Sequence, residues 1–200
     1  MKNKKDLELQ LSKLEELKPS LIKSEQYQTP SSIAADISWD AYMNGDIKSK
    51  RIVDLGCGNG IFGIGALLLG AKKVFFVDSD PKAIDLAQEN SLSLNLQGIF
   101  INSDISKFNF PVDTVIMNPP FGTKLKHADR NFLEQAFKIS KSIYSIHKIE
   151  SKGFIEKFSR DNKFKVIDIK KLSFPIKHSY KFHKKPKVEI EIGCWHLRKL

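Results

Sequence analysis

The stretch Arg51-Ile-Val-Asp-Leu-Gly-Cys-Gly-Asn-Gly60 decides the fold of this chain. Its first half, Arg51–Leu55, is short, apolar and β-branched, which predicts a buried strand. Its second half has glycines at 56, 58 and 60, which let the backbone turn and pass close beneath a ligand. A dinucleotide-binding fingerprint would need its third glycine at position 61, which is Ile61, so the loop does not favour NAD. The stretch therefore predicts the first strand and the ligand loop of an α/β sheet.

Outward from this loop, apolar runs alternate with helical patterns. We predict strands at 51–55, 73–78, 98–102, 114–117 and 142–146, and helices at 61–70, 81–93, 129–141 and 151–160. Alternating strands and helices imply a parallel sheet flanked by helices. Two further strands, 164–172 and 188–198, have no helix between them and so predict an antiparallel hairpin on the edge of the sheet.

The first 50 residues predict a helical extension ahead of the core at 51–200. Three leucines at helical spacing (residues 7, 11 and 14) predict a helix that Pro19 ends. Thr29 and Pro30 predict the N-cap and first residue of a second helix, which runs out at Asn44-Gly45. No repeat or linker interrupts the chain, so we expect a single domain over residues 1–200.

The composition is that of a soluble globular protein, with 41% apolar and 28% charged residues. No apolar run is long enough for a membrane span, and no signal peptide follows the charged N-terminus. The two cysteines lack metal-ligand spacing, so we expect a reducing compartment: the cytoplasm, or the nucleus in a eukaryote.

The formal charge of +10 is concentrated near the C-terminus. Residues 1–50 carry eight basic and eight acidic residues, whereas 163–187 holds nine lysines against Asp168 alone. Aromatic residues are interleaved with these lysines at 164, 174, 180 and 182, which makes stacking on bases available. A lysine-rich solvated face is the simpler interpretation, but the density of the segment favours contacts with RNA phosphates, made by Lys181, His183, Lys184, Lys185 and Lys187.

Polar residues follow the second and third predicted strands, at the edge where ligands bind in open α/β sheets. Asp78 ends the second strand, and a carboxylate there can accept both hydroxyls of a ribose. Asp104 and Ile105 follow the third, where the carboxylate can accept an adenine amine and Ile105 can pack on the ring. Each carboxylate alone is more often a loop cap, but the agreement of successive strand ends argues against coincidence.

The fourth of these strands, Asp113-Thr-Val-Ile-Met117, runs into Asn118-Pro119-Pro120-Phe121. The two prolines prevent both helix and ladder pairing, because neither has an N–H and each fixes φ. They leave the Asn118 amide, an uncovered Pro119 carbonyl and the Phe121 ring at the strand end. This set suits a planar substrate with an NH2 group, although a simple strand-ending turn has the same sequence.

The loop at 54–60 and the Asn-Pro-Pro-Phe motif together resemble the class I S-adenosylmethionine-dependent methyltransferases. Four longer stretches, spread over nearly the whole chain, resemble the methyltransferase-like protein 5 family of rRNA adenine N6-methyltransferases: Glu25–Thr29, Asp113–Lys124, Ile143–Lys148 and Ser179–Lys185. The resemblance implies a Rossmann-like, seven-stranded methyltransferase sheet, mostly parallel with a C-terminal antiparallel hairpin.

The resemblance also implies S-adenosylmethionine as the cofactor. Gln26 and Thr29 would reach over it from the N-terminal segment, and the glycine loop would line its methionine part. The expected cofactor-binding residues are Gln26, Thr29, Asp54, Gly56, Gly58, Asn59, Ile61, Asp78, Asp104 and Ile105. The catalytic set is Asn118, Pro119, Pro120 and Phe121, with no metal, and His147 stays outside it as a structural histidine.

Relatives in this family pair with a small zinc-binding activator protein. In seven-stranded methyltransferase sheets the third strand lies on an edge, and here Gly98–Asn102 is apolar, which leaves the edge exposed to pairing unless it is covered. We therefore expect a heterodimer through this edge, with coverage by local helices as the alternative.

The Asn-Pro-Pro motif does not by itself select the substrate. Protein-glutamine methyltransferases of the release-factor type also carry it, and guanine N2 is another exocyclic amine. An RNA-binding assembly factor that kept the fold without catalysis is the non-enzymatic alternative. The short N-terminal extension and the basic segment favour RNA over a protein substrate. The family resemblance, carried by the segment with Gln26 and Thr29 and by Ser179–Lys185, implies N6-methylation of an adenosine in small-subunit ribosomal RNA.

Overall fold

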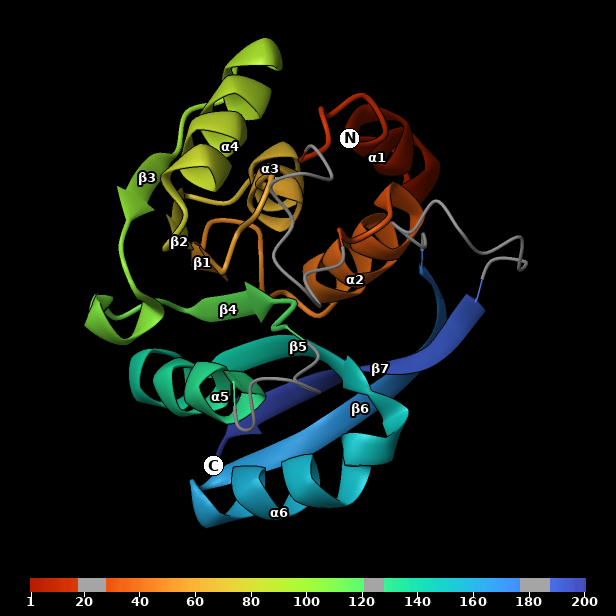
Figure 1. The fold of residues 1–200 in the computed structure, drawn as a ribbon, viewed down its shortest axis with the longest axis vertical. Helices are drawn as coiled ribbons and strands as arrows, with labels where there is room; N and C mark the ends of the chain where they lie inside the picture. The colour runs from red at the N-terminus through yellow and green to blue at the C-terminus, as the bar shows by residue number, and fades with distance from the viewer. Residues whose placement is uncertain (18–27, 121–127, 177–187) are drawn as a thin grey trace, which may run out of the picture.

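The computed structural model describes residues 1–17, 28–120, 128–176 and 188–200. Its centre is a seven-stranded sheet in the order β3-β2-β1-β4-β5-β7-β6 (Figure 1). The strands are β1 (Arg51–Leu55), β2 (Lys73–Asp78), β3 (Ile99–Asn102), β4 (Thr114–Met117), β5 (Ser142–Lys148), β6 (Phe164–Ile176) and β7 (Val188–Lys199). Strands β1 to β5 are parallel, and β7 pairs antiparallel with β5 and β6. The predicted parallel sheet with a C-terminal hairpin is confirmed.

Helices cover both faces of this sheet (Figure 1). In the described parts of the chain they are α1 (Lys4–Leu11), α2 (Ser31–Met43), α3 (Ile61–Leu68), α4 (Pro81–Ser93), α5 (Ala128–Ile139) and α6 (Lys152–Asp161). Alternate strand residues point to opposite faces, so Ile52 and Phe76 pack with α1 to α4 while Val53 and Phe75 pack with α5 and α6. None of these helices is long and apolar enough to cross a membrane.

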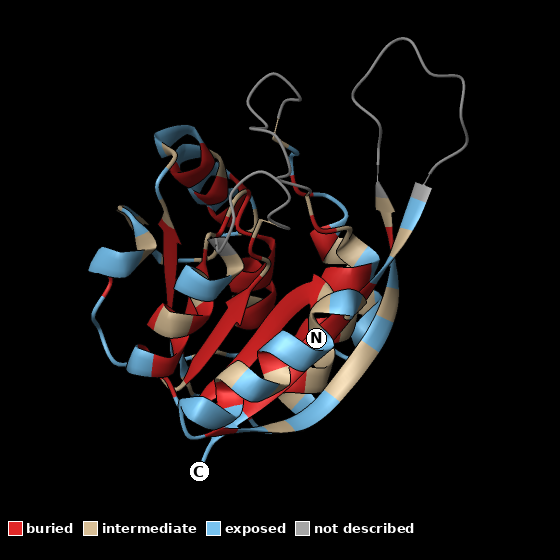
Figure 2. Ribbon diagram, turned by 60° about the horizontal axis from the view of Figure 1, so that its bottom comes forward, coloured by how far each residue is buried: buried red, intermediate tan, exposed pale blue. Residues whose placement is uncertain are grey.

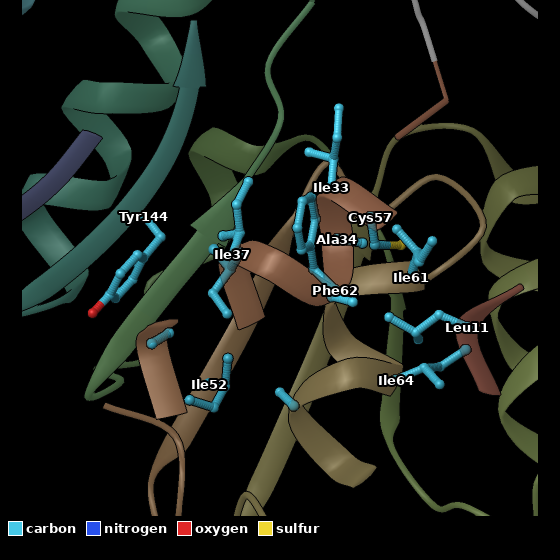
Figure 3. Packing of buried hydrophobic residues seen from close by; sticks show 14 of the residues in the cluster. Leu11, Ile33, Ala34, Ile37, Ile52, Cys57, Ile61, Phe62, Ile64 and Tyr144 are labelled. Carbon is cyan, nitrogen blue, oxygen red and sulfur yellow. The ribbon is translucent and has the colours of Figure 1, made fainter. Parts of the chain in front are cut away.

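The central strands are buried on both faces, and the N-terminal helices belong to the same core (Figure 2). Figure 3 shows Leu11 of α1 beside Ile64 of α3, and Ile33 of α2 near Phe62 and Cys57. Helices α1 and α2 are therefore packed on the same face of the sheet as α3, which follows the glycine loop. This packing places the N-terminal segment where it can contribute to a site at the carboxyl ends of the strands.

Two N-terminal predictions need correction. The first helix ends at Leu11, well before Pro19, because the backbone N–H and C=O of Glu15 bond the side chain of Asn90 instead of continuing the helix. Thr29 is not the N-cap of α2. Pro30 holds that position, and its carbonyl accepts the first helical bond from Ala34 at 2.9 Å.

In its described part, residues 163–176, the basic segment also differs from the prediction. Phe164 and Phe174 are buried in the core and are not available for stacking on bases. Lys170 pairs with Asp40 at 2.7 Å, and Lys171 lies 3.7 Å from Glu191. The charges of these two lysines are therefore partly balanced by carboxylates of the same molecule.

Candidate active site

A cavity of about 640 Å³ opens at the carboxyl ends of β1, β2 and β4. Most of the predicted site residues line it together: Thr29, Gly56, Gly58, Asn59, Ile61, Asp78, Asp104, Ile105, Asn118, Pro119 and Pro120. A cavity of this size at this edge is the usual small-molecule site of an open α/β sheet. The expectation that separate strand ends build one site therefore agrees with the geometry.

The glycine loop forms the floor of the cavity. Gly56 has φ +72°, and a Cβ added to it would lie 2.8 Å from the ring of Phe132. Gly60 has φ +83°, and its added Cβ would lie 3.0 Å from the Cβ of Ala87. At both positions the backbone conformation and the lack of space exclude a side chain, and the backbone of Gly56 lies at the cavity wall.

Asp54 differs from the role expected of it. Its Oδ2 accepts the Gly63 N–H at 2.8 Å, and the side chain is buried and is not part of the cavity wall. Burial, with a smaller contribution from the charge of Asp78, raises the pKa of Asp54 to about 8. Asp54 therefore connects the end of β1 to the first turn of α3, the two elements that the glycine loop joins.

The two remaining carboxylates are held in place by backbone N–H groups and, at Asp104, also by a hydroxyl. Asp78 accepts the Gly58 N–H through Oδ2 at 3.0 Å and the Asp80 N–H through Oδ1 at 2.9 Å. Asp104 accepts the hydroxyl and the N–H of Ser106, both through Oδ1, and these bonds lower the pKa of Asp104. Since each carboxylate oxygen has two lone pairs, Asp78 keeps capacity for ligand hydroxyls while its position is fixed.

Asn118 is oriented by the N-terminal segment. Its Nδ2 donates to the Thr29 hydroxyl at 3.0 Å, so the hydroxyl that does not cap α2 is used here instead. Pro119 is buried, and both prolines line the cavity. Because neither proline has an N–H, the backbone at this strand end offers only acceptors. The arrangement suits a ligand group that donates protons.

Asn59 lines the cavity, but its side chain points to a partner that the sequence did not indicate. Nδ2 donates to the Glu15 carbonyl at 3.1 Å, and only 3% of the residue is exposed. The expected contact between Asn59 and the methionine part of a cofactor therefore falls to the backbone of the loop.

Other predicted residues lie outside the part of the chain that the structure describes: Gln26, Phe121, Lys181, His183, Lys184, Lys185 and Lys187. His147 is described and is structural. It is buried, its Nε2 lies 2.6 Å from the Ser145 hydroxyl, and burial lowers its pKa to about 3.

Sequence reasoning missed one wall of the cavity. Five residues of the wall come from α5 and two from the N-terminal segment: Asn131, Phe132, Glu134, Gln135, Lys138, Leu17 and Gln28. The helical pattern predicted α5 itself, but no motif marks which of its residues face a ligand. Phe132 could have been found only through its contact with Gly56, which is distant in sequence.

Known proteins resemble this chain in sequence and fold. The family model described as "Methyltransferase small domain" matches residues 41–145. The rRNA N6-adenosine-methyltransferase METTL5 of Danio rerio is 36% identical, over 94% of this chain and 95% of that protein. The Drosophila melanogaster protein of the same name is 35% identical, over 86% and 84%. A candidate RNA methyltransferase from Pyrococcus horikoshii has a crystal structure that matches with a TM-score of 0.91 and 43% identity, over 100% and 99% of the chains.

Proposed function

The chain belongs to the METTL5 family of rRNA N6-adenosine methyltransferases, and from this premise we propose that it methylates N6 of an adenosine in small-subunit ribosomal RNA. S-adenosylmethionine is the methyl donor. One observation carries the proposal. Asn118 and Pro119 line the same cavity as the glycine loop and Asp78. The amine-binding group and the donor-binding groups therefore share a single site.

The described residues fit S-adenosylmethionine. The backbone of the glycine loop suits its methionine part, the Asp78 carboxylate its ribose hydroxyls, and Asp104 with Ile105 its adenine. The cofactor supplies an electrophilic methyl group. The chain supplies position and hydrogen-bond acceptors, since an amine lone pair that is delocalised into a purine ring is a weak nucleophile.

Asn118 and Pro119 act on that amine. With Nδ2 committed to the Thr29 hydroxyl, the Asn118 amide presents Oδ1 as an acceptor for one amine proton, and the Pro119 carbonyl accepts the other. Two acceptors hold the nitrogen and turn its electron density toward the methyl donor. Phe121, by sequence, would stack on the base and fix its plane.

The substrate class is tested by where a labelled methyl group goes. Ribosomal subunits are incubated with the enzyme and labelled S-adenosylmethionine and then digested separately with ribonuclease and protease. We expect label that ribonuclease releases, in small-subunit RNA. Label that resists ribonuclease and is released by protease would favour the glutamine methyltransferase alternative instead. Label in large-subunit RNA alone would contradict the choice of subunit.

We further propose a small zinc-binding activator protein as a partner at the β3 edge. Ile99 is 38% exposed there, and Phe110, stacked on Phe75 at 5.9 Å, is 60% exposed. Strand β3 is short but contains no lysine and no proline, so neither a charge nor a missing N–H in it discourages an added strand. A protein that is monodisperse and fully active when purified alone would contradict this partner. We place the pair in the cytoplasm.

A further inference from the structure

Two buried asparagines hold the peptide groups of Glu15, where the chain leaves α1 and passes the glycine loop. Asn90, on α4, accepts the Glu15 N–H through Oδ1 at 2.8 Å and donates from Nδ2 to the Glu15 carbonyl at 3.1 Å. Asn59, within the loop, donates to the same carbonyl at 3.1 Å. Asn90 also donates to the Asn59 carbonyl at 3.0 Å, which joins the two elements.

Asn59 and Asn90 bond the backbone of Glu15 and not its side chain. A side-chain amide that pairs with both the N–H and the C=O of one residue imitates a neighbouring strand, and it satisfies groups that are costly to bury alone. Asn59 and Asn90 are each 3% exposed, whereas the Glu15 side chain is exposed. The contact therefore fixes where the chain runs at residue 15, whatever side chain stands there.

The segment held in this way, residues 12–17 (called the strap below), leads directly to the cavity. Leu17 lines the cavity, and its N–H donates to Gln28 Oε1 at 3.2 Å. A Cβ added to Gly58 would lie 3.9 Å from Leu17 Cδ1, and the Gly58 N–H bonds Asp78. At its other end the strap begins beside Leu11, which is buried against α3 (Figure 3). Strap, loop and Asp78 are thus one connected unit.

We propose that Asn59 and Asn90 form a latch that holds the strap at the cofactor site, and that Asn90 is a positioning residue for cofactor binding although it does not line the cavity. The inference rests on the proposed cofactor site. If the cofactor binds tightly only when the strap is closed, the measured affinity falls in proportion to the closed fraction. By linkage, bound cofactor must in turn favour the closed strap.

Four variants test the latch by calorimetric titration with S-adenosylmethionine. Asn90→Leu removes both halves of the contact, and Glu15→Pro removes the N–H that Asn90 accepts, so both should bind about tenfold more weakly. Asn90→Asp keeps the acceptor but loses the donor and should also bind more weakly. Glu15→Ala keeps both backbone groups and is the matched control, with wild-type affinity. The loss should raise KM for the cofactor more than it lowers kcat.

Cleavage by trypsin after Lys13, which is exposed at the strap, gives a readout independent of activity. Cleavage should be faster in Asn90→Leu and Glu15→Pro than in the wild type, and added cofactor should slow it in the wild type. Wild-type affinity and wild-type cleavage in both variants would overturn the latch, as would an equal loss in Glu15→Ala. A wild-type protein that binds no S-adenosylmethionine would overturn the proposed function instead, and the cleavage rates without cofactor would still decide the latch.

Discussion

At the amino ends of β4 and β5, Asp46 accepts bonds from Tyr144 at 2.8 Å and Arg198 at 2.6 Å, and lies 3.3 Å from His196. At the carboxyl ends of the same sheet, Asp78, Asp104 and Asn118 bond mainly to backbone or to one hydroxyl and line an open cavity. In the first cluster the Asp46 carboxylate is bonded by polar and charged side chains, whereas in the second the Asp78 and Asp104 carboxylates are held by neighbouring backbone and hydroxyl groups at the wall of a cavity. Under the proposed function, the difference separates groups that stabilise the fold from groups that serve the reaction.

Removing the Asn118 amide should affect methyl transfer at the carboxyl ends of the strands and leave the cluster at their amino ends intact. Asn118→Ala should abolish methyl transfer, a loss of at least about a thousandfold, because one of the two acceptors for the amine disappears. Affinity for S-adenosylmethionine should persist, since the loop and Asp78 are untouched. Single-turnover transfer and calorimetric titration measure the two effects, and wild-type turnover in this variant would disprove the mechanism.

Removing the Asp46 charge should weaken the cluster at the amino ends of the strands. Asp46→Asn should lower the free energy of unfolding by about 2 kcal/mol, less than the loss of a fully buried pair because Arg198 is partly exposed. At a temperature where the variant remains folded, turnover should be retained. Urea unfolding and turnover on the same preparation are the check, and a variant that keeps its stability but loses activity would reverse the assignment of the two ends.

The pKa of Asp46 predicts how the free energy of unfolding depends on pH. Burial alone would raise the pKa of Asp46, but hydrogen bonds from His196 and Tyr144 and the charge of Arg198 hold it below its ordinary value. A depressed pKa gives stability that is present above the ordinary pKa of about 4 and lost as the pH falls below it. Asp46→Asn should therefore reduce the acid sensitivity of unfolding, and an unchanged slope between about pH 5 and 3 would contradict this.

The bond between Thr29 and Asn118 offers a smaller perturbation of the reactive end. Thr29→Val removes the hydroxyl at nearly constant volume and frees the amide to turn, so kcat should fall about tenfold. Thr29→Ser keeps the hydroxyl and should restore most of the rate. A change in cofactor affinity with kcat unaltered would show that Thr29 contacts only the cofactor.

The smallest expected effect is on RNA binding, and it involves residues at neither end of the sheet. Reversing Lys184 and Lys185 to Glu should weaken RNA binding and make its logarithmic salt dependence less steep by about two, roughly one unit for each phosphate that the protein no longer neutralises. Binding measured at several salt concentrations gives the slope. An unchanged slope would remove these lysines from the RNA interface.

Much of the fold could be predicted because the apolar runs at 51–55 and 73–78 are short, β-branched and bounded by turn residues. The carboxylate at Asp78 and the amide at Asn118 were likewise predictable, since strand ends in an open sheet converge. These features depend on local sequence and on a general rule of topology.

The rest depends on contacts that sequence spacing does not reveal. Asn90 meets Glu15 across 75 positions, and Asn118 meets Thr29 across 89. A Thr-Pro pair locally favours a cap, and only the tertiary contact shows where the hydroxyl goes. Phe164 and Phe174 looked available for RNA because the lysines around them dominate the local composition, whereas burial in the two-sided core decides their role.

The central claim is that the carboxyl-end site methylates adenine N6 in ribosomal RNA. Nucleoside analysis of RNA from small ribosomal subunits, after reaction with labelled S-adenosylmethionine, tests it most directly. The label should appear in N6-methyladenosine and be absent with Asn118→Ala. Label in N2-methylguanosine, or no label from a protein that binds the cofactor, would contradict the claim.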